Sequence, residues 1–300
     1  MITVSEYLKQ RYGQKIYRLA LSSGCSCPNR DGTIGTGGCT FCSEGGSGDF
    51  AAPFLPVDEQ IRLARQRVDA KIPASIPPDQ RKYIAYFQSY TNTWGDEKRL
   101  RKLYTETVSR PEIVILSLGT RPDCLPPEML AMIRDLNRIK PVWIELGLQT
   151  IHEKTSRRIH RGYDLPVFEE AYRNLTAMGI SVIVHVILGL PGETREDMLD
   201  TVRYLSQLDP PLSGVKLQLL HILKGTEMAR EYSAVPEDFL KMSMEEYTDL
   251  VAACLSILPE TTVIHRMTGD GPKKLLIAPA WSADKKRVLN MLHAKIRVMG

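Results

Sequence analysis

Short apolar runs alternate with longer stretches of helical period along most of this 300-residue chain. The runs are rich in β-branched and aromatic residues, which favour strands, whereas the longer stretches repeat their apolar residues at helical spacing. Strands are predicted at residues 15–21, 82–88, 112–118, 142–148, 181–188 and 214–220. Helices are predicted between them at residues 58–70, 96–109, 127–138, 167–178 and 195–208. This order predicts an α/β fold, in which a parallel sheet with right-handed crossovers curls into a full or partial barrel.

Polar, glycine-rich segments follow five of the predicted strands. They read, in chain order, SSGCSCPNRDG, QSYTNTWG, GTRPDC, GLQT and GLPGET. Ordinary turn chemistry explains any one of them taken singly. In a parallel barrel, however, the carboxyl ends of the strands meet at one edge, and such folds place their chemistry there. Five polar segments at that edge therefore predict one shared functional site.

The pattern changes from about residue 225 into a helical and charged tail. Helices are predicted at residues 243–258 and 283–298, with the sequence HRMTGDGPKK in the segment that joins them. Ser243, followed three residues later by Glu246, forms a capping box and marks a helix start. We therefore expect a core of residues 1–224 and a short C-terminal α/β extension of residues 225–300.

The overall charge excludes little, because 39 Lys and Arg residues against 35 Asp and Glu residues give a net charge of only +4. Such a weak basic bias does not identify a polyanionic partner. The N-terminal segment carries charges throughout and lacks the apolar core of a signal peptide, and no later run is long enough to span a membrane. We expect a cytoplasmic protein with no membrane partner. Thiols are kept reduced in that compartment, so clustered cysteines are expected to bind metal or to act in redox chemistry.

Three of the six cysteines lie in the loop CPNRDGTIGTGGCTFC, residues 27–42, and Cys25 lies just upstream. In one interpretation Cys25, Cys27, Cys39 and Cys42 form a structural Cys₄ zinc site. In the other, three cysteines bind a four-iron cluster and leave one iron open for a small molecule. Spacing alone does not separate the two interpretations. The placement favours the second, because a loop after the first strand lies over the barrel mouth, where a reactive centre is useful.

Five motifs together resemble those of a known enzyme family. They are the cysteine loop, YFQSYTNTWG at 86–95, LSLGTRPDCLP at 116–126, IELGLQT at 144–150 and ILGLPGET at 187–194. In this order on successive predicted strands they resemble radical S-adenosylmethionine (radical SAM) enzymes of the Elongator catalytic-subunit-like group. The sequences HRMTGDGP and APAWSADK in the tail are similar to those of a bacterial branch that lacks the acetyltransferase domain. The resemblance implies a partial (β/α)₆ radical SAM barrel with a short C-terminal α/β extension.

The resemblance also implies the cofactors, a [4Fe-4S] cluster and S-adenosyl-L-methionine. The cysteine directly before Pro-Asn-Arg-Asp-Gly is the first cluster ligand in this group, which makes Cys27, Cys39 and Cys42 the expected ligands. The eleven residues between Cys27 and Cys39 are typical of this group. Cys25, Cys124 and Cys254 are expected to be packing residues.

Further positions are implied for the binding of S-adenosylmethionine. By resemblance to related radical enzymes, Gln149, Arg161 and His185 are candidates to contact its ribose or methionine groups. A carboxylate often occupies the place of His185, and a hydrogen-bonded interior histidine is the alternative interpretation. The Gly-Gly-Glu type motif that is usual after the second strand is absent. Gln88 and Ser89 stand in that place and are assigned to cofactor binding.

The Elongator-like group modifies wobble uridine in tRNA, so the resemblance implies an enzyme that alters the side chain at C5 of that base. It also implies an external reductant such as flavodoxin or ferredoxin. Local basic clusters are compatible with contacts to phosphates: Lys98, Arg99, Arg101 and Lys102; Arg157, Arg158 and Arg161; Lys273 and Lys274; Lys285, Lys286 and Arg287. Two alternatives remain: a radical SAM enzyme for a small metabolite or a protein, and a non-catalytic, zinc-stabilised binding module.

Overall fold

Eight parallel strands form the main sheet of the computed structural model, which describes residues 1–46, 48, 51–269 and 271–299. The order of the strands across the sheet is β1-β9-β7-β6-β5-β4-β3-β2. They are β1 (Ile2–Thr3), β2 (Tyr17–Leu21), β3 (Tyr83–Phe87), β4 (Ile113–Thr120), β5 (Val142–Gln149), β6 (Ser181–Leu188), β7 (Gly214–Leu219) and β9 (Val263–Arg266). The six strands predicted from the sequence are β2 to β7, and they follow one another in the sheet.

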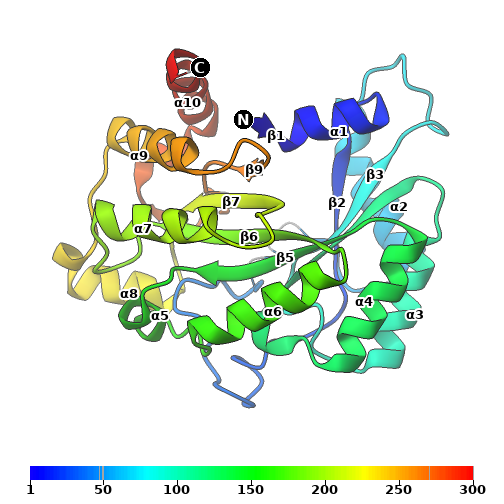
Figure 1. Cartoon of the computed structure of the whole chain (residues 1–300), viewed down its shortest axis with the longest axis horizontal. Coiled ribbons are helices and arrows are strands. Elements are labelled where there is room, and N and C mark those ends of the chain that lie inside the picture. Colours follow the sequence, from blue (N-terminus) through cyan, green and yellow to red (C-terminus); the bar gives the residue numbers. More distant parts are fainter. Residues whose placement is uncertain (47, 49–50, 270, 300) are drawn as a thin grey trace.

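Most of the helices cover the outer side of the curved sheet (Figure 1). The described helices are α1 (Val4–Tyr12), α2 (Val57–Val68), α3 (Glu97–Val108), α4 (Pro127–Ile139), α5 (Glu153–Arg158), α6 (Leu165–Ala177), α7 (Arg195–Ser206), α8 (Glu227–Ala234), α9 (Met244–Ile257) and α10 (Lys285–Met299). Each predicted helix is present within two residues at either end. In α3, for example, Leu100, Tyr104 and Val108 are fully buried at four-residue spacing, which is the amphipathic pattern that the sequence shows. None of the described helices is both long and apolar enough to cross a lipid bilayer.

The sheet is a half-barrel whose two edges remain open, as expected for a partial (β/α)₆ barrel. A side-chain contact crosses the gap between the two sides of the sheet. Arg18 of β2 lies 3.2 Å from the Nδ1 atom of His265 of β9. Apolar residues near the start of the strands, such as Trp143 and Ile183, pack against Leu8 of α1. Helix α1 therefore closes the N-terminal end of the half-barrel and leaves the carboxyl ends of the strands accessible.

The chain from residue 222 onward contains helix α8 and three short strands that the sequence analysis missed. Strand β9 pairs with β7 and with β1 in the main sheet, although it belongs to the segment expected to form the extension. Strands β8 (Ile222–Leu223) and β10 (Leu276–Ala278) form a separate antiparallel pair. The capping box of Ser243 and Glu246 is present at the start of α9, as predicted. The tail thus contributes a strand to the main sheet near one edge of the half-barrel, and it also covers that edge.

Candidate active site

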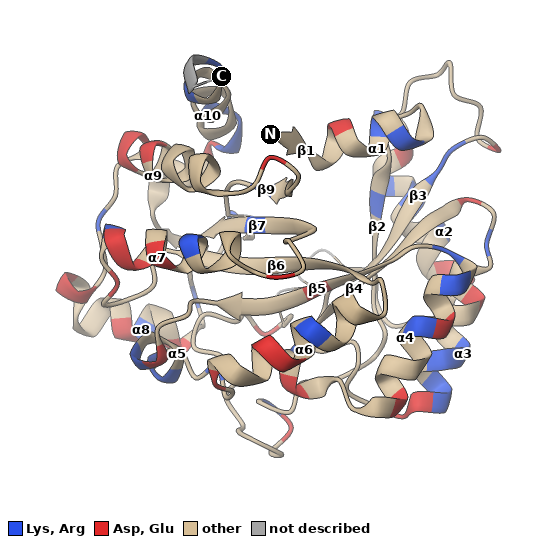
Figure 2. Ribbon diagram, in the orientation of Figure 1, with Lys and Arg blue, Asp and Glu red and all other residues tan. Residues whose placement is uncertain are grey.

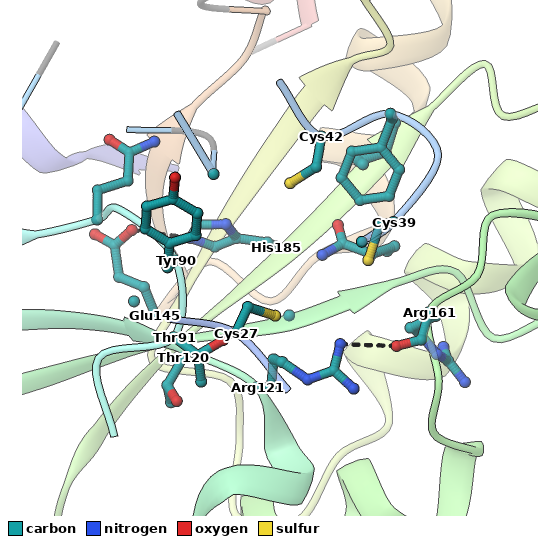
Figure 3. Close-up of a pocket in the computed structure, with 18 of the residues that line it drawn as sticks. Cys27, Cys39, Cys42, Tyr90, Thr91, Thr120, Arg121, Glu145, Arg161 and His185 are labelled. Carbon is teal, nitrogen blue, oxygen red and sulfur yellow. Dashed lines mark hydrogen bonds and ion pairs between the residues drawn. The ribbon is translucent and has the colours of Figure 1, made fainter. Parts of the chain in front are cut away.

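A cavity of about 150 Å³ opens at the carboxyl ends of the strands, where the polar segments predict a shared site. The cysteine loop and the ends of β3 to β7 form its wall (Figure 3). Seven of the eight residues that the resemblance assigned to cofactors line it: Cys27, Cys39, Cys42, Gln88, Gln149, Arg161 and His185. The structure therefore brings together residues that are up to 158 positions apart, from 27 to 185.

The three cysteines of the loop face one space from different sides (Figure 3). The backbone N–H of Cys42 donates to the carbonyl of Cys39 at 2.9 Å, which closes a tight turn between them. The Arg30 guanidinium donates to the carbonyl of Cys42 at 3.1 Å. Gly38 has a φ of +79°, and a Cβ atom there would lie 2.6 Å from the Arg30 side chain, so the loop needs glycine at this position. These contacts fix the backbone around Cys39 and Cys42.

Asp31 anchors the same loop to the turn after β3. Its carboxylate accepts hydrogen bonds from the Ser26 hydroxyl at 2.8 Å, the Thr33 hydroxyl at 2.7 Å and the Trp94 indole N–H at 2.7 Å. The bonds from Thr33, Ser26 and Trp94 hold the pKa of Asp31 well below its usual range. The carboxylate is therefore ionised at any physiological pH, and the anchor does not depend on pH there.

Cys25 does not join the other three. It is only 8% exposed and belongs to the apolar core, where Arg99 approaches its sulfur at 3.5 Å. Within the part of the chain that the structure describes, no three His, Cys, Asp or Glu side chains converge as ligands of a single metal ion. A Cys₄ zinc site requires such convergence. Cys124 and Cys254 are buried as well, so all three extra cysteines lie where packing residues are expected.

The geometry of Cys27, Cys39 and Cys42 fits a multi-iron cluster. Three soft thiolates arranged around a common space, without convergence on one point, are the ligand set for such a cluster. Burial and the neighbouring thiol of Cys42 raise the pKa of Cys39 to about 12. A bound metal centre would displace this proton, because metal ligation requires the thiolate form. Asn29 donates to the sulfur of Cys39 at 3.6 Å and holds it in place.

Gln149 has the features of a ligand-binding residue. Its φ of +68° lies in the left-handed region, which is strained for a residue with a side chain. Its Oε1 atom is buried and has no hydrogen-bond partner among the described residues. A Cβ atom at Gly147 would lie 3.0 Å from its amide nitrogen, so a glycine makes room for this side chain. A bound polar ligand would satisfy the buried amide oxygen.

Arg161 lines the cavity, but its hydrogen bonds are to backbone carbonyls of the protein. It is 1% exposed, and it donates to the carbonyls of Leu148 at 2.8 Å, Thr150 at 2.7 Å and Tyr163 at 2.9 Å. Those bonds fix the backbone on both sides of Gln149. Arg161 therefore positions Gln149, the candidate ligand-binding residue. The sequence also places Arg161 in a basic surface cluster, and that prediction is wrong because its side chain is buried.

Arg121 is a site residue that the sequence analysis missed, although it lies in the polar segment GTRPDC. Its guanidinium binds the Asp123 carboxylate with two hydrogen bonds, at 2.9 and 2.7 Å, and donates to the carbonyl of Arg161 at 2.9 Å. It lies beside the cysteine space (Figure 3). This arrangement places a fixed cation near Cys39, and its charge acts against the rise in the pKa of that thiol.

The floor of the cavity is a cluster of titratable side chains. Glu145 is buried and accepts hydrogen bonds from His185 at 2.9 Å, Tyr86 at 2.7 Å and Ser117 at 3.1 Å, and it forms an ion pair with Lys216. Burial alone would raise the pKa of Glu145, but the Lys216 charge and the His185 hydrogen bond outweigh it and hold that pKa well below its usual range. Burial lowers the pKa of Lys216 to about 7 and that of His185 to about 4. His185 is therefore a neutral, hydrogen-bonded residue.

Gln88 and Ser89 differ in their orientation. Gln88 lines the cavity, and its side chain has no hydrogen-bond partner within residues 1–46, 48, 51–269 and 271–299. Ser89 is 7% exposed, and its hydroxyl donates to the carbonyl of Gly48 at 3.5 Å. Ser89 thus contacts the loop that follows the cysteines and not the cavity.

Comparison with known proteins places these features in a family. Residues 29–205 match the Radical SAM superfamily, and residues 212–297 match the Radical_SAM C-terminal domain. The chain is 40% identical over 298 residues to protein YtqA of Bacillus subtilis (strain 168), covering 99% of this chain and 90% of that protein. It is 25% identical over 170 residues to Elongator complex protein 3 of Schizosaccharomyces pombe, covering 56% of this chain and 30% of that protein.

A solved structure supports the same fold. The archaeal Methanocaldococcus infernus Elp3 superimposes with a TM-score of 0.67 at 16% identity, over 94% of this chain and 64% of that chain. When bound, the superfamily's cofactors supply a 5′-deoxyadenosyl radical that abstracts hydrogen from unactivated C–H bonds. The three thiols and the unsatisfied amide of Gln149 fit these cofactors. The chain belongs to the radical SAM superfamily, is related to Elongator complex protein 3, and is an enzyme whose cofactors are a [4Fe-4S] cluster and S-adenosylmethionine.

Proposed function

We propose that this enzyme alters the side chain at C5 of wobble uridine in tRNA. The observation that carries the proposal is the relationship to Elongator complex protein 3, which covers 56% of this chain. The carboxyl ends of the strands are accessible, and a base from a single-stranded loop can be unstacked and inserted there. A reductant such as flavodoxin or ferredoxin would supply the electron.

We also propose roles for the cavity residues. Cys27, Cys39 and Cys42 hold the cluster. Gln149, His185 and Gln88 contact S-adenosylmethionine, and the unsatisfied amide oxygen of Gln149 supports this most directly. The remaining two candidates act indirectly: Arg161 holds the backbone around Gln149, and Ser89 holds the loop at Gly48.

The candidate RNA surface is smaller than the sequence indicates. Arg101 is paired with Glu97 and Asp135, and Arg158 with Glu231 and Asp238. Figure 2 shows Lys and Arg interspersed with Asp and Glu on α3 and α4. The basic candidates with exposed side chains are Lys98, Lys102, Arg157, Lys273, Lys274, Lys286 and Arg287. We propose that phosphate contacts come from this set.

The division of the chain stays a proposal as well. Residues 1–224 would form the radical SAM core and residues 225–300 the C-terminal extension. Because β9 completes one edge of the main sheet, we propose that the extension folds with the core and adds a wall to the substrate site. The matched C-terminal domain begins nearby, at residue 212, which supports this division.

The modified-nucleoside profile of tRNA tests the function. Cells that lack this protein should accumulate a precursor form of C5-substituted wobble uridine, and the wild-type gene should restore the product. A gene encoding Cys39→Ala should not restore it, because the chemistry needs all three thiolates. An unchanged profile would overturn the proposal and favour a small metabolite or a protein as substrate. In that case tRNA would also fail to stimulate formation of 5′-deoxyadenosine by the purified enzyme.

A further inference from the structure

A second cavity, of about 100 Å³, adjoins the first at the open side of the half-barrel. The two cavities share four wall residues: Phe41, Gln88, Ile187 and Gln218. Gln88 follows β3, near one edge of the sheet, whereas Gln218 and Arg266 belong to β7 and β9, near the other edge. The second cavity therefore lies across the gap between the edges.

The tail motif HRMTGDGP builds the far wall of this second cavity. Gly271 donates its backbone N–H to the Nδ1 atom of His221 at 3.2 Å. A Cβ atom at Gly271 would lie 2.9 Å from that same nitrogen, so the loop is shaped closely around the imidazole ring. Arg266, the second residue of the motif, reaches Gln218 on the neighbouring strand. The motif thus contributes shape and one fixed cation to a cavity that connects with the cofactor site.

Arg266 determines which way the amide of Gln218 faces. Its Nη1 atom lies 2.8 Å from Oε1 of Gln218. A guanidinium group has only donors, so the atom that faces it must be the amide oxygen. The Nε2 amino group then points away from Arg266, and it has no acceptor among the described residues. Gln218 therefore presents two N–H donors at the junction of the two cavities.

We infer that Gln218, held by Arg266, donates a hydrogen bond to O4 of the target uracil and selects uracil against cytosine. This inference rests on the proposed function, because it takes a uridine as the substrate. Uracil has an acceptor oxygen at C4, where cytosine has an amino donor. A fixed N–H donor can bind the oxygen of uracil, whereas it repels the amino group of cytosine.

The position of O4 on the ring also suits the chemistry. C4 and C5 are neighbouring atoms, so an anchor at O4 holds the C5 side chain close to the shared wall. From that wall the first cavity leads to Cys27, Cys39 and Cys42. Phe41 and Ile187 supply apolar surface beside the amide, which suits the faces of a base. The site that reads the base is thereby placed next to the site that reacts with its side chain.

Binding of two matched RNA probes tests the inference. The probes are anticodon stem-loops that differ only in carrying 5-methyluridine or 5-methylcytidine at the wobble position. Wild-type protein, loaded with its cluster and S-adenosylmethionine, should prefer the uridine probe about tenfold or more. In Gln218→Leu the ratio of the two affinities should be close to one, because the variant binds the uridine probe more weakly. Gln218→Glu should shift the preference toward cytidine, because a carboxylate accepts from the cytosine amino group.

Two further variants separate recognition from folding. Arg266→Met frees the amide of Gln218 to turn, so it should bind the cytidine probe more tightly than wild type does. Gln207→Leu, at an exposed position after α7, is the matched control and should keep the wild-type ratio. The affinity of each variant for S-adenosylmethionine is measured in parallel by equilibrium binding.

The outcomes distinguish the inference from the proposed function. If wild-type protein binds neither probe more tightly than a scrambled hairpin, both the inference and the proposed function are overturned. If it binds both probes equally, or if Gln218→Glu keeps the uridine preference, the inference falls and the proposed function stands. A loss of S-adenosylmethionine affinity in Gln218→Leu that matches its loss of RNA affinity would place Gln218 at the cofactor and overturn the inference too.

Discussion

We expect the position of each cysteine to separate cluster ligands from packing residues in this chain. Cys27→Ala, Cys39→Ala and Cys42→Ala should each abolish the iron charge-transfer absorbance of anaerobically reconstituted protein, because each removes one of three thiolates. Cys25→Ala should retain it, since Cys25 lies in the apolar core beside Arg99. Metal analysis of the four variants and the wild type is the measurement. Stoichiometric zinc without an iron–sulfur signal in the wild type would contradict the assignment.

The strained backbone at Gln149 carries a prediction about cofactor affinity. Gln149→Ala removes an amide whose oxygen is buried and without a partner. It should weaken S-adenosylmethionine binding about tenfold, which corresponds to roughly one hydrogen bond to a charged or polar ligand. Iron content should be unchanged, because the side chain is not a cluster ligand. Titration of cluster-loaded protein measures the affinity, and unchanged binding would show that Gln149 does not contact the cofactor.

The titration of His185, on the cavity floor, makes the free energy of unfolding depend on pH. Its pKa is lowered to about 4 in the folded protein, from an ordinary value near 6.5. The unfolded chain therefore binds more protons between these values, so the free energy of unfolding falls as pH drops from about 6.5 toward 4. His265, whose pKa burial also lowers, adds a contribution of the same sign. His185→Gln should reduce the slope between pH 6.5 and 5 in urea unfolding. An unchanged slope would mean that His185 titrates normally.

At the scale of strands, β5 and β7 are joined through one buried ion pair. Lys216 and Glu145 are 1% and 0% exposed, so loss of either partner leaves a buried charge uncompensated. Lys216→Met or Glu145→Gln alone should cost about 3–5 kcal/mol of unfolding free energy. The double variant should recover a large part of that cost, because it buries no unpaired charge. Urea unfolding of all three measures this, and additive costs in the double variant would contradict the coupling.

The elements that the sequence predicts are those whose signal is local. Strands β2 to β7 are apolar runs with β-branched residues, and the cysteine spacing identifies the expected cluster ligands. Strand β1 has two residues and pairs with β9 some 260 positions later, so no local pattern reveals it. Helix α1 does have a local signal, the capping box of Thr3 and Glu6. The pairing of Glu145 with Lys216 spans 71 positions and depends on sheet order, which periodicity does not give.

At the scale of the whole molecule, the segment that follows residue 224 adds to one side of the half-barrel. It supplies β9 at one edge of the sheet and the loop whose glycine packs against His221. The N-terminal strand β1 pairs with β9 on this side of the sheet (Figure 1).

The last prediction concerns long-range attraction of RNA to this side of the half-barrel. Lys273 and Lys274 are exposed and follow Gly271, a wall residue of the second cavity. If both contact phosphates, tRNA affinity should fall steeply with salt, because each contact releases condensed counterions. Replacing both with Ala should reduce the slope of log affinity against log salt by about 1.5. Lys98→Ala with Lys102→Ala, on the mixed-charge surface of α3, is the matched control and should change the slope less. Equal slopes in the two double variants would place the RNA on another face of the enzyme.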